Sequence, residues 1–255
     1  MLIQWIFLIS TVTLGSAGWI QERIVGGHLV PISAVPWQAA LLRNGTLNCG
    51  AVIYSDQILI TAAHCLSNNT SELSIRVGSS IWNYGGQVLE VAGLVVHKDF
   101  RVLPNKIVVN DIAVIRVKSS LKMGRSVRSI PLANSSPKNG SSASVSGWGR
   151  IGFKESISDS LLEATVDIVD QENCQESYGK GITKELICAA AQGKDSCSLD
   201  SGGPLVSGGK LVGIVSFGEG CGDPNYPGVY VNVAELKPWI LKAIKSFSCP
   251  CTGTI

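Results

Sequence analysis

Short β-rich runs separated by turn residues recur along most of this chain, and they constrain its fold more than any other feature. The chain contains 28 glycines and 10 prolines, enough to end many strands in turns. It shows no internal repeat and no alternation of strands with helical segments, which excludes solenoids and doubly wound folds. We therefore predict a mostly β protein, with strands in the runs GAVIYSDQILITAA, VLEVAGLVVH, DIAVIRV, SASVSGWG, LLEATVDIV, KLVGIVSF and GVYVNV.

One segment near the end of the chain has helical periodicity instead. Between roughly Val233 and Lys245 the apolar residues fall on one face of a helix, with the lysines mostly off it; the apolar set is Leu236, Trp239, Ile240, Ala243 and Ile244. The best linker candidate is NSSPKNGSSAS at residues 134–144, rich in Ser, Asn, Pro and Gly. It would divide the chain into two β-rich halves of similar size.

Length and composition fit a folded protein with a substantial core. The chain has 255 residues, of which 45% are hydrophobic and 16% charged, which argues against disorder. The formal net charge is only +2, without a dense Lys/Arg block. That charge argues against nucleic acid or an anionic membrane surface as a partner.

The first residues read as a secretory leader. MLIQWIFLISTVTLGSAG is apolar and ends in small residues, with Gly15 and Ala17, or Ser16 and Gly18, placed as a signal peptidase requires. The rival interpretation is a retained signal anchor. Its apolar core is shorter than the ~20 residues that a membrane span needs, and no basic cluster flanks it. We predict a signal peptide at residues 1–18, a secreted extracellular product and no membrane association after cleavage.

The cysteines agree with that compartment. Eight cysteines behind a secretory leader indicate disulfides formed in an oxidising environment. The chain also carries Asn-x-Ser/Thr acceptor sequences, which permit glycosylation of a secreted protein, at Asn44, Asn68, Asn69, Asn134 and Asn139.

Three short segments contain residue types that can cooperate in nucleophilic catalysis: TAAHC around His64, NDIAV around Asp111 and DSGGP around Ser201. A serine hydroxyl is a poor nucleophile at neutral pH unless a base accepts its proton. Imidazole is the usual base, and a buried carboxylate fixes its tautomer and stabilises the imidazolium that forms. Taken alone, each segment could equally be an ordinary loop or strand end with no catalytic role. Their order, His then Asp then Ser, is one in which catalytic triads occur, so we interpret them as a candidate triad.

The chain as a whole resembles the chymotrypsin/trypsin family of serine proteases from Ile24 to about Lys245. The resemblance rests on segments that occur in the family's order: IVGG, PWQAAL, CGAVI, LITAAHC, NDIAVIRV, GWG, CAA, DSGGPLV, LVGIVSFG and PGVYVNV. It implies an all-β fold with two six-stranded antiparallel β-barrels, the active site packed between them, and a C-terminal helix. His64 and Asp111 would come from the first barrel and Ser201 from the second.

The resemblance also implies roles for residues around the triad. The backbone N–H groups of Leu199 and Ser201 would form an oxyanion hole. Asp195 would lie at the base of the primary specificity pocket, where a desolvated carboxylate favours Arg or Lys. Together with it, the substrate-binding set would comprise Ser196, Ser216, Phe217, Gly218 and Gly228.

Zymogen activation follows from QERIVGG in the same way. Cleavage after Arg23 would remove a propeptide, residues 19–23, and release an α-amine on Ile24 that pairs with Asp200. The peptidase domain would then span residues 24–247, with its barrel boundary near 134–144, followed by a tail, residues 248–255. By resemblance the disulfides would be Cys49–Cys65, Cys174–Cys188 and Cys197–Cys221. Cys249 and Cys251 have no counterpart in the family and could pair with each other, join two molecules or stay free.

Three positions depart from the family pattern. Phe217 replaces the usual Trp, and Leu199 replaces a nearly invariant Gly. The loop after Arg76 lacks paired acidic residues, so we expect no calcium there, and no other metal or cofactor. The sequence thus predicts a monomeric endopeptidase that cuts proteins or peptides after Arg or Lys and is open to protein inhibitors. The alternative, raised by Leu199, is a catalytically impaired homologue that acts as a binding or regulatory protein.

Overall fold

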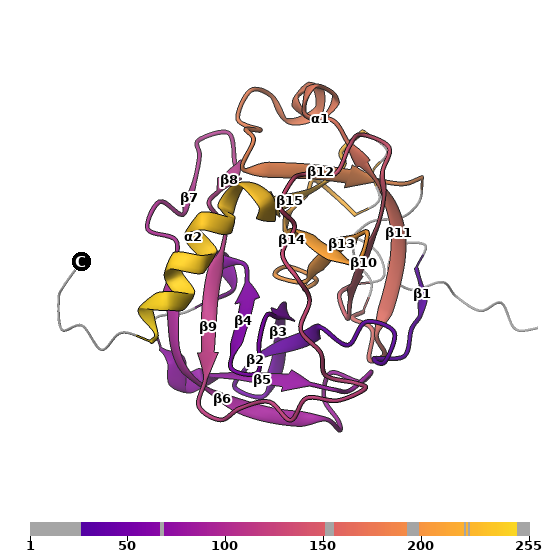
Figure 1. Ribbon diagram of the computed structural model, residues 1–255. Helices are drawn as coiled ribbons and strands as arrows, with labels where there is room; N and C mark the ends of the chain where they lie inside the picture. Colours follow the sequence, from indigo (N-terminus) through magenta and orange to yellow (C-terminus); the bar gives the residue numbers. More distant parts are fainter. Residues whose placement is uncertain are drawn as a thin grey trace, which may run out of the picture.

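Strands dominate the computed structural model, which describes residues 27–66, 69–150, 156–192, 199–221, 223 and 225–248. They form two bodies that lie one above the other in Figure 1, with the earlier strands below and the later strands above. The long C-terminal helix runs beside the lower body. The prediction of an all-β fold with one C-terminal helix is confirmed.

The first body is a closed six-stranded antiparallel barrel in the order β2-β3-β4-β9-β6-β5. Its interior is filled because inward positions are apolar: in β5 the alternation of buried and half-buried residues follows LSIRV. The strands are β2 (Gln38–Arg43), β3 (Thr46–Ile53), β4 (Ile58–Thr61), β5 (Leu73–Val77), β6 (Gln87–Val96) and β9 (Ala113–Val117).

The second body also closes, because β11 pairs with β12 in addition to its neighbour β10. Along β11 the sequence LEATVDIV buries every second side chain, while Thr165 and Asp167 between them are exposed and Glu163 is half-buried. The strands are β10 (Ser142–Gly147), β11 (Leu162–Val169), β12 (Leu186–Ala190), β13 (Pro204–Ser207), β14 (Lys210–Phe217) and β15 (Gly228–Asn232). The two predicted six-stranded barrels are therefore both present.

Helices are few and short apart from α2 (Val233–Ser246). Its bounds match the predicted helix within a residue, and Leu236, Ile240 and Ala243 on its apolar face are buried. The shorter elements include η1 (Ala63–Cys65), η2 (Thr70–Glu72), α1 (Gln171–Tyr178), and the hairpin of β7 (Arg101–Val102) and β8 (Val108–Val109). None of the helices in these described ranges is long and apolar enough to cross a membrane.

Both ends of the described chain cross to the opposite barrel. Strand β1 (His28–Leu29) pairs with β11 of the second barrel, whereas α2, which follows the second barrel, packs against β9 of the first as well as against β14 and β15. The apolar core of the first barrel continues into Ile214 and Val231 of the second, so the two barrels share one packed interface. The connection between them runs from the end of β9 to the start of β10, and residues 142–144 of the predicted linker already belong to β10.

Candidate active site

His64 projects from η1, a single helical turn that directly follows β4 of the first barrel. Its backbone N–H donates to Asp111 Oδ1 at 2.9 Å, and its ring Nδ1 lies 2.7 Å from Asp111 Oδ2. Both contacts go to one carboxylate, so the backbone and the ring of this residue are fixed together. The side chain remains 35% exposed, which leaves the far side of the ring open to a bound molecule.

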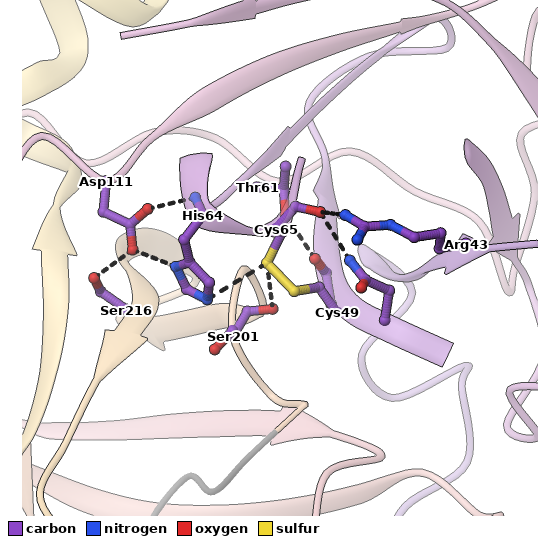
Figure 2. The surroundings of a disulfide bond; sticks show 10 residues. Arg43, Cys49, Thr61, His64, Cys65, Asp111, Ser201 and Ser216 are labelled. Carbon is purple, nitrogen blue, oxygen red and sulfur yellow. Dashed lines mark hydrogen bonds and ion pairs between the residues drawn. A yellow bond between two sulfur atoms is a disulfide. The ribbon is translucent and has the colours of Figure 1, made fainter. Parts of the chain in front are cut away.

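Asp111 lies just before β9 and is fully buried. A buried carboxylate is tolerated only where donors surround it. Besides the two donors of His64, Ser216 in β14 donates its hydroxyl to Asp111 Oδ2 at 2.6 Å. One carboxylate therefore accepts hydrogen bonds from both barrels (Figure 2).

These contacts decide which ring nitrogen of His64 can act as a base. A carboxylate accepts and does not donate, so the proton of neutral His64 lies on Nδ1. The lone pair of Nε2 is then directed away from Asp111. In Figure 2 that nitrogen faces the Cys65 sulfur, 3.8 Å away, and the segment of Ser201.

Ser201 lies in the turn that precedes β13 of the second barrel. Its carbonyl accepts from Gly50 N–H at 2.8 Å and lies 3.7 Å from Cys65 Sγ. The turn is closed by Gly203 N–H donating to the Asp200 carbonyl, and by Gly202 N–H donating to the Val215 carbonyl. The structure thus brings together all three residues of the predicted triad.

The other two histidines lie in different surroundings. His28 is exposed in the edge strand β1. His97 packs against Trp239, with ring centroids 4.7 Å apart, and partial burial lowers its pKa below the usual value, with Asp99 opposing and Lys98 reinforcing that shift. Among the residues that the structure describes, no buried carboxylate bonds to either of them as Asp111 bonds to His64.

Two disulfides implied by the resemblance are present. Cys49–Cys65 joins β3 to η1, and Cys174–Cys188 joins α1 to β12. Cys221 is also disulfide-bonded, whereas Cys197, its expected partner, lies outside the described residues, as do Cys249 and Cys251. The first bridge removes both sulfurs from the one His/Cys cluster of the described residues that is compact enough for a metal, Cys49, His64 and Cys65.

Only some of the predicted specificity residues lie within the part of the chain that the structure describes. Asp195 and Ser196 lie outside the described residues. Phe217 ends β14, and Gly228 begins β15. A Cβ atom placed on Gly218 would lie in van der Waals contact with Gly228 Cα, at 4.0 Å, so a side chain on Gly218 would occupy the space between these two segments.

Tyr178 contacts both the segment after β14 and the segment before β15. No motif in the sequence indicates this contact. Its hydroxyl donates to the Pro227 carbonyl at 2.9 Å and accepts from Glu219 N–H at 3.2 Å. Its ring also meets Phe217 edge-on, with centroids 5.8 Å apart.

Asp200, directly before Ser201, is a buried acid that is only 1% exposed. Gly149 N–H donates to its Oδ1 at 2.7 Å, and a Cβ atom at Gly147 would lie 2.1 Å from the same oxygen. The carboxylate thus lies where only glycine fits beside it. Arg23 and Ile24 lie outside the described residues.

Leu199 adopts a backbone conformation that normally requires glycine, with φ at +77°. For a residue with a Cβ atom this region costs about 1–2 kcal/mol. The side chain packs against an apolar cluster that includes Ala40, Leu47 and Trp148. That burial offsets part of the backbone cost.

The comparisons with known proteins agree with this geometry. The sequence profile of the Trypsin family matches residues 24–240. The chain is 47% identical to trypsin delta of Drosophila erecta, covering 94% of this chain and 99% of that protein. It is 46% identical to trypsin alpha-4 of Lucilia cuprina, covering 93% of each. Among solved structures, neuropsin, a serine protease expressed in the limbic system of mouse brain, superposes with a TM-score of 0.81 at 36% identity, covering 86% of this chain and 98% of the other.

Replacing Ser216 by Ala tests whether its hydrogen bond to the Asp111 carboxylate supports the active site. The change removes one of the donors to Asp111, and a hydrogen bond to a charged group contributes about 1.5–3 kcal/mol. We expect a fluorophosphonate, which modifies a base-activated serine, to label Ser201 at least roughly tenfold more slowly. Ser207→Ala, which removes a hydroxyl bonded to the Ser142 carbonyl outside the site, is the matched control. Equal labelling rates for both variants would mean that the Ser216 contact does not support the site.

Proposed function

This chain belongs to the trypsin family and is a trypsin-like serine endopeptidase, and from that premise we propose that it is a secreted zymogen which, once cut after Arg23, hydrolyses peptide bonds after Arg or Lys. The observation that carries the proposal is the fully buried Asp111 carboxylate, which holds the His64 ring beside Ser201. Substrates of this family are proteins or peptides.

In the proposed reaction Ser201 Oγ attacks the scissile carbonyl carbon while His64 Nε2 takes its proton. His64 then returns that proton to the leaving amine as the C–N bond breaks and an ester to Ser201 remains. Water, deprotonated by the same nitrogen, then attacks the ester carbonyl, and His64 returns that proton to Ser201 Oγ as the bond between the acyl carbon and Oγ breaks. Asp111 keeps the proton of neutral His64 on Nδ1 and stabilises the imidazolium through both steps.

The oxyanion formed in each step would bind to the N–H groups of Leu199 and Ser201. The positive φ of Leu199 supports this role, because the backbone keeps the conformation that a glycine would take despite the isobutyl group. We therefore propose that the donor is retained and that the side chain narrows the cleft on the leaving-group side.

Specificity for Arg and Lys rests on Asp195, six residues before Ser201. The relatives at 47% and 46% identity are named trypsins, which supports the assignment. The space between Gly218 and Gly228 would admit a long side chain, whose cation would then meet the carboxylate of Asp195.

Activation rests on Asp200, whose buried carboxylate would receive the new α-amine of Ile24. A buried charge is stabilised by an opposite charge brought to it, so cleavage after Arg23 would supply the counter-charge that orders the pocket. The leader at residues 1–18 supports secretion. The alternative of an impaired homologue finds no support among these relatives, which are named trypsins or a serine protease.

Asp195→Ser tests the specificity. Removing one partner of a buried ion pair costs about 3–5 kcal/mol, so kcat/KM for Arg and Lys substrates should fall by about two orders of magnitude or more. Asp167→Ser, at an exposed acid on β11, should change nothing. A peptide library cut by the wild type mainly after Phe or Leu would contradict the assignment of Asp195.

Arg23→Gln tests activation. The secreted variant should remain an intact, inactive precursor, whereas Arg125→Gln, at an exposed arginine, should mature normally. Amino-terminal sequencing of the active wild type should begin at Ile24. Full activity from the uncut Arg23→Gln protein would refute the scheme.

Leu199→Gly tests the oxyanion proposal. If the donor is already in place, turnover of small ester and amide substrates should change little, while a rigid protein inhibitor that fills the leaving-group side should bind markedly tighter. Lys106→Gly, at another residue with positive φ (+65°), controls for relief of backbone strain alone. A hundredfold or greater rise in small-substrate turnover would show instead that Leu199 disables the oxyanion hole.

A further inference from the structure

The carbonyl of Cys65, the residue after His64, is held by two side chains that the triad does not include. Asn48 Nδ2 donates to it at 2.8 Å and Arg43 Nη2 at 3.0 Å. Figure 2 shows the Arg43 guanidinium reaching this oxygen from the side opposite the His64 ring. Both acceptor sites of the carbonyl are thereby used.

The local structure explains why this carbonyl needs outside donors. Cys65 is 2% exposed and ends η1, a helix of one turn, and no backbone N–H of the described residues donates to its carbonyl. A buried carbonyl without a partner is costly. The donors come instead from the hairpin of β2 and β3.

The register of the β2–β3 hairpin lets the Asn48 side chain reach the Cys65 carbonyl. Along β2 and β3, Leu41 pairs with Cys49 but the next residue, Leu42, pairs with Leu47, so Asn48 has no register partner. An extra residue of this kind is a β-bulge, which redirects a side chain and is common beside active sites. Arg43 closes the same hairpin opposite Thr46, at its Asn44–Gly45 turn.

Three consecutive residues of β3 thus contact both the residue after the general base His64 and the nucleophile Ser201. Asn48 bonds the carbonyl after His64, Cys49 forms the disulfide to Cys65, and Gly50 N–H donates to the Ser201 carbonyl at 2.8 Å. Gly50 allows that approach because a Cβ atom there would lie 2.8 Å from Gly203 Cα. This strand therefore contacts both the residue after His64 and the backbone of Ser201.

We propose that Asn48 and Arg43 are positioning residues for catalysis: by fixing the Cys65 carbonyl they hold His64 at the distance from Ser201 that proton transfer requires. The proposal rests on the proposed roles of His64 and Ser201. It differs from a purely structural role because proton transfer depends steeply on donor–acceptor geometry, whereas substrate binding and folding do not.

The test compares Asn48→Leu and Arg43→Met in the protein activated by cleavage after Arg23. Each removes one donor at similar side-chain volume. We expect kcat to fall about three- to tenfold, as loss of one neutral or charge-assisted hydrogen bond implies, while KM for a small substrate changes less than about twofold. The rate of fluorophosphonate labelling should fall with kcat, and Asn48→Gln, which keeps an amide donor, should recover most of it.

Gln87→Leu and Arg76→Met are matched controls, because each removes a donor to a backbone carbonyl, of Lys122 and of Gly85, away from the site. The amplitude of labelling measures the fraction of molecules with a folded active site, whereas the rate of labelling depends on the geometry of His64 and Ser201. A variant that folds poorly is therefore still informative, because its rate can be measured on the folded fraction. Unchanged labelling rates with a lowered Tm would show that the contacts only stabilise the fold and would overturn the proposal. A wild type that is not labelled at all would instead refute the triad itself.

Discussion

The buried carboxylate of Asp111 is the interaction on which the rest of this structure depends. It is fully buried, and the three hydrogen bonds that His64 and Ser216 make to it compensate for its lost contact with water. Those donors belong to different barrels, so the carboxylate both links the barrels and orients the imidazole. The same contacts leave Nε2 as the one nitrogen that can accept a proton.

Close approach of the two barrels is the second requirement, and glycine makes it possible. A Cβ atom at Gly202 would lie 2.2 Å from Thr61 Oγ1, and one at Gly50 would lie 2.8 Å from Gly203 Cα. Strand β3 can therefore run directly against the turn of Ser201. The backbone contact between Gly50 and Ser201 follows from that closeness. Activation, in our proposal, uses the adjoining buried acid, Asp200.

Much of this arrangement could be predicted from the sequence because local patterns and family motifs agree. The alternation in β11 and the apolar face of α2 have the periods of a half-buried strand and a packed helix. The order of the His64, Asp111 and Ser201 segments predicted the site, and Ser216 was expected only as a substrate contact before the structure placed it on Asp111.

Other features depend on register and tertiary placement, which local pattern does not encode. Whether Asn48 points at the Cys65 carbonyl is decided by a bulge, and a shift of one residue would turn it away. The bridging role of Tyr178 requires α1 to lie against the loop before β15. A positive φ at Leu199 is strained for any residue other than glycine. The packing of its side chain against an apolar cluster, which the sequence does not reveal, explains how the chain tolerates that strain.

Asp111→Asn tests the central claim most directly. The variant keeps the shape of the side chain, but its amide has only one acceptor oxygen and presents N–H groups towards His64, which favours the opposite tautomer. The measurement is the rate at which a fluorophosphonate labels Ser201 in the folded, activated protein. The account predicts labelling slower by several orders of magnitude with the fold retained. A rate within about tenfold of the wild type would contradict it, because His64 would then not need the buried carboxylate to act as the base.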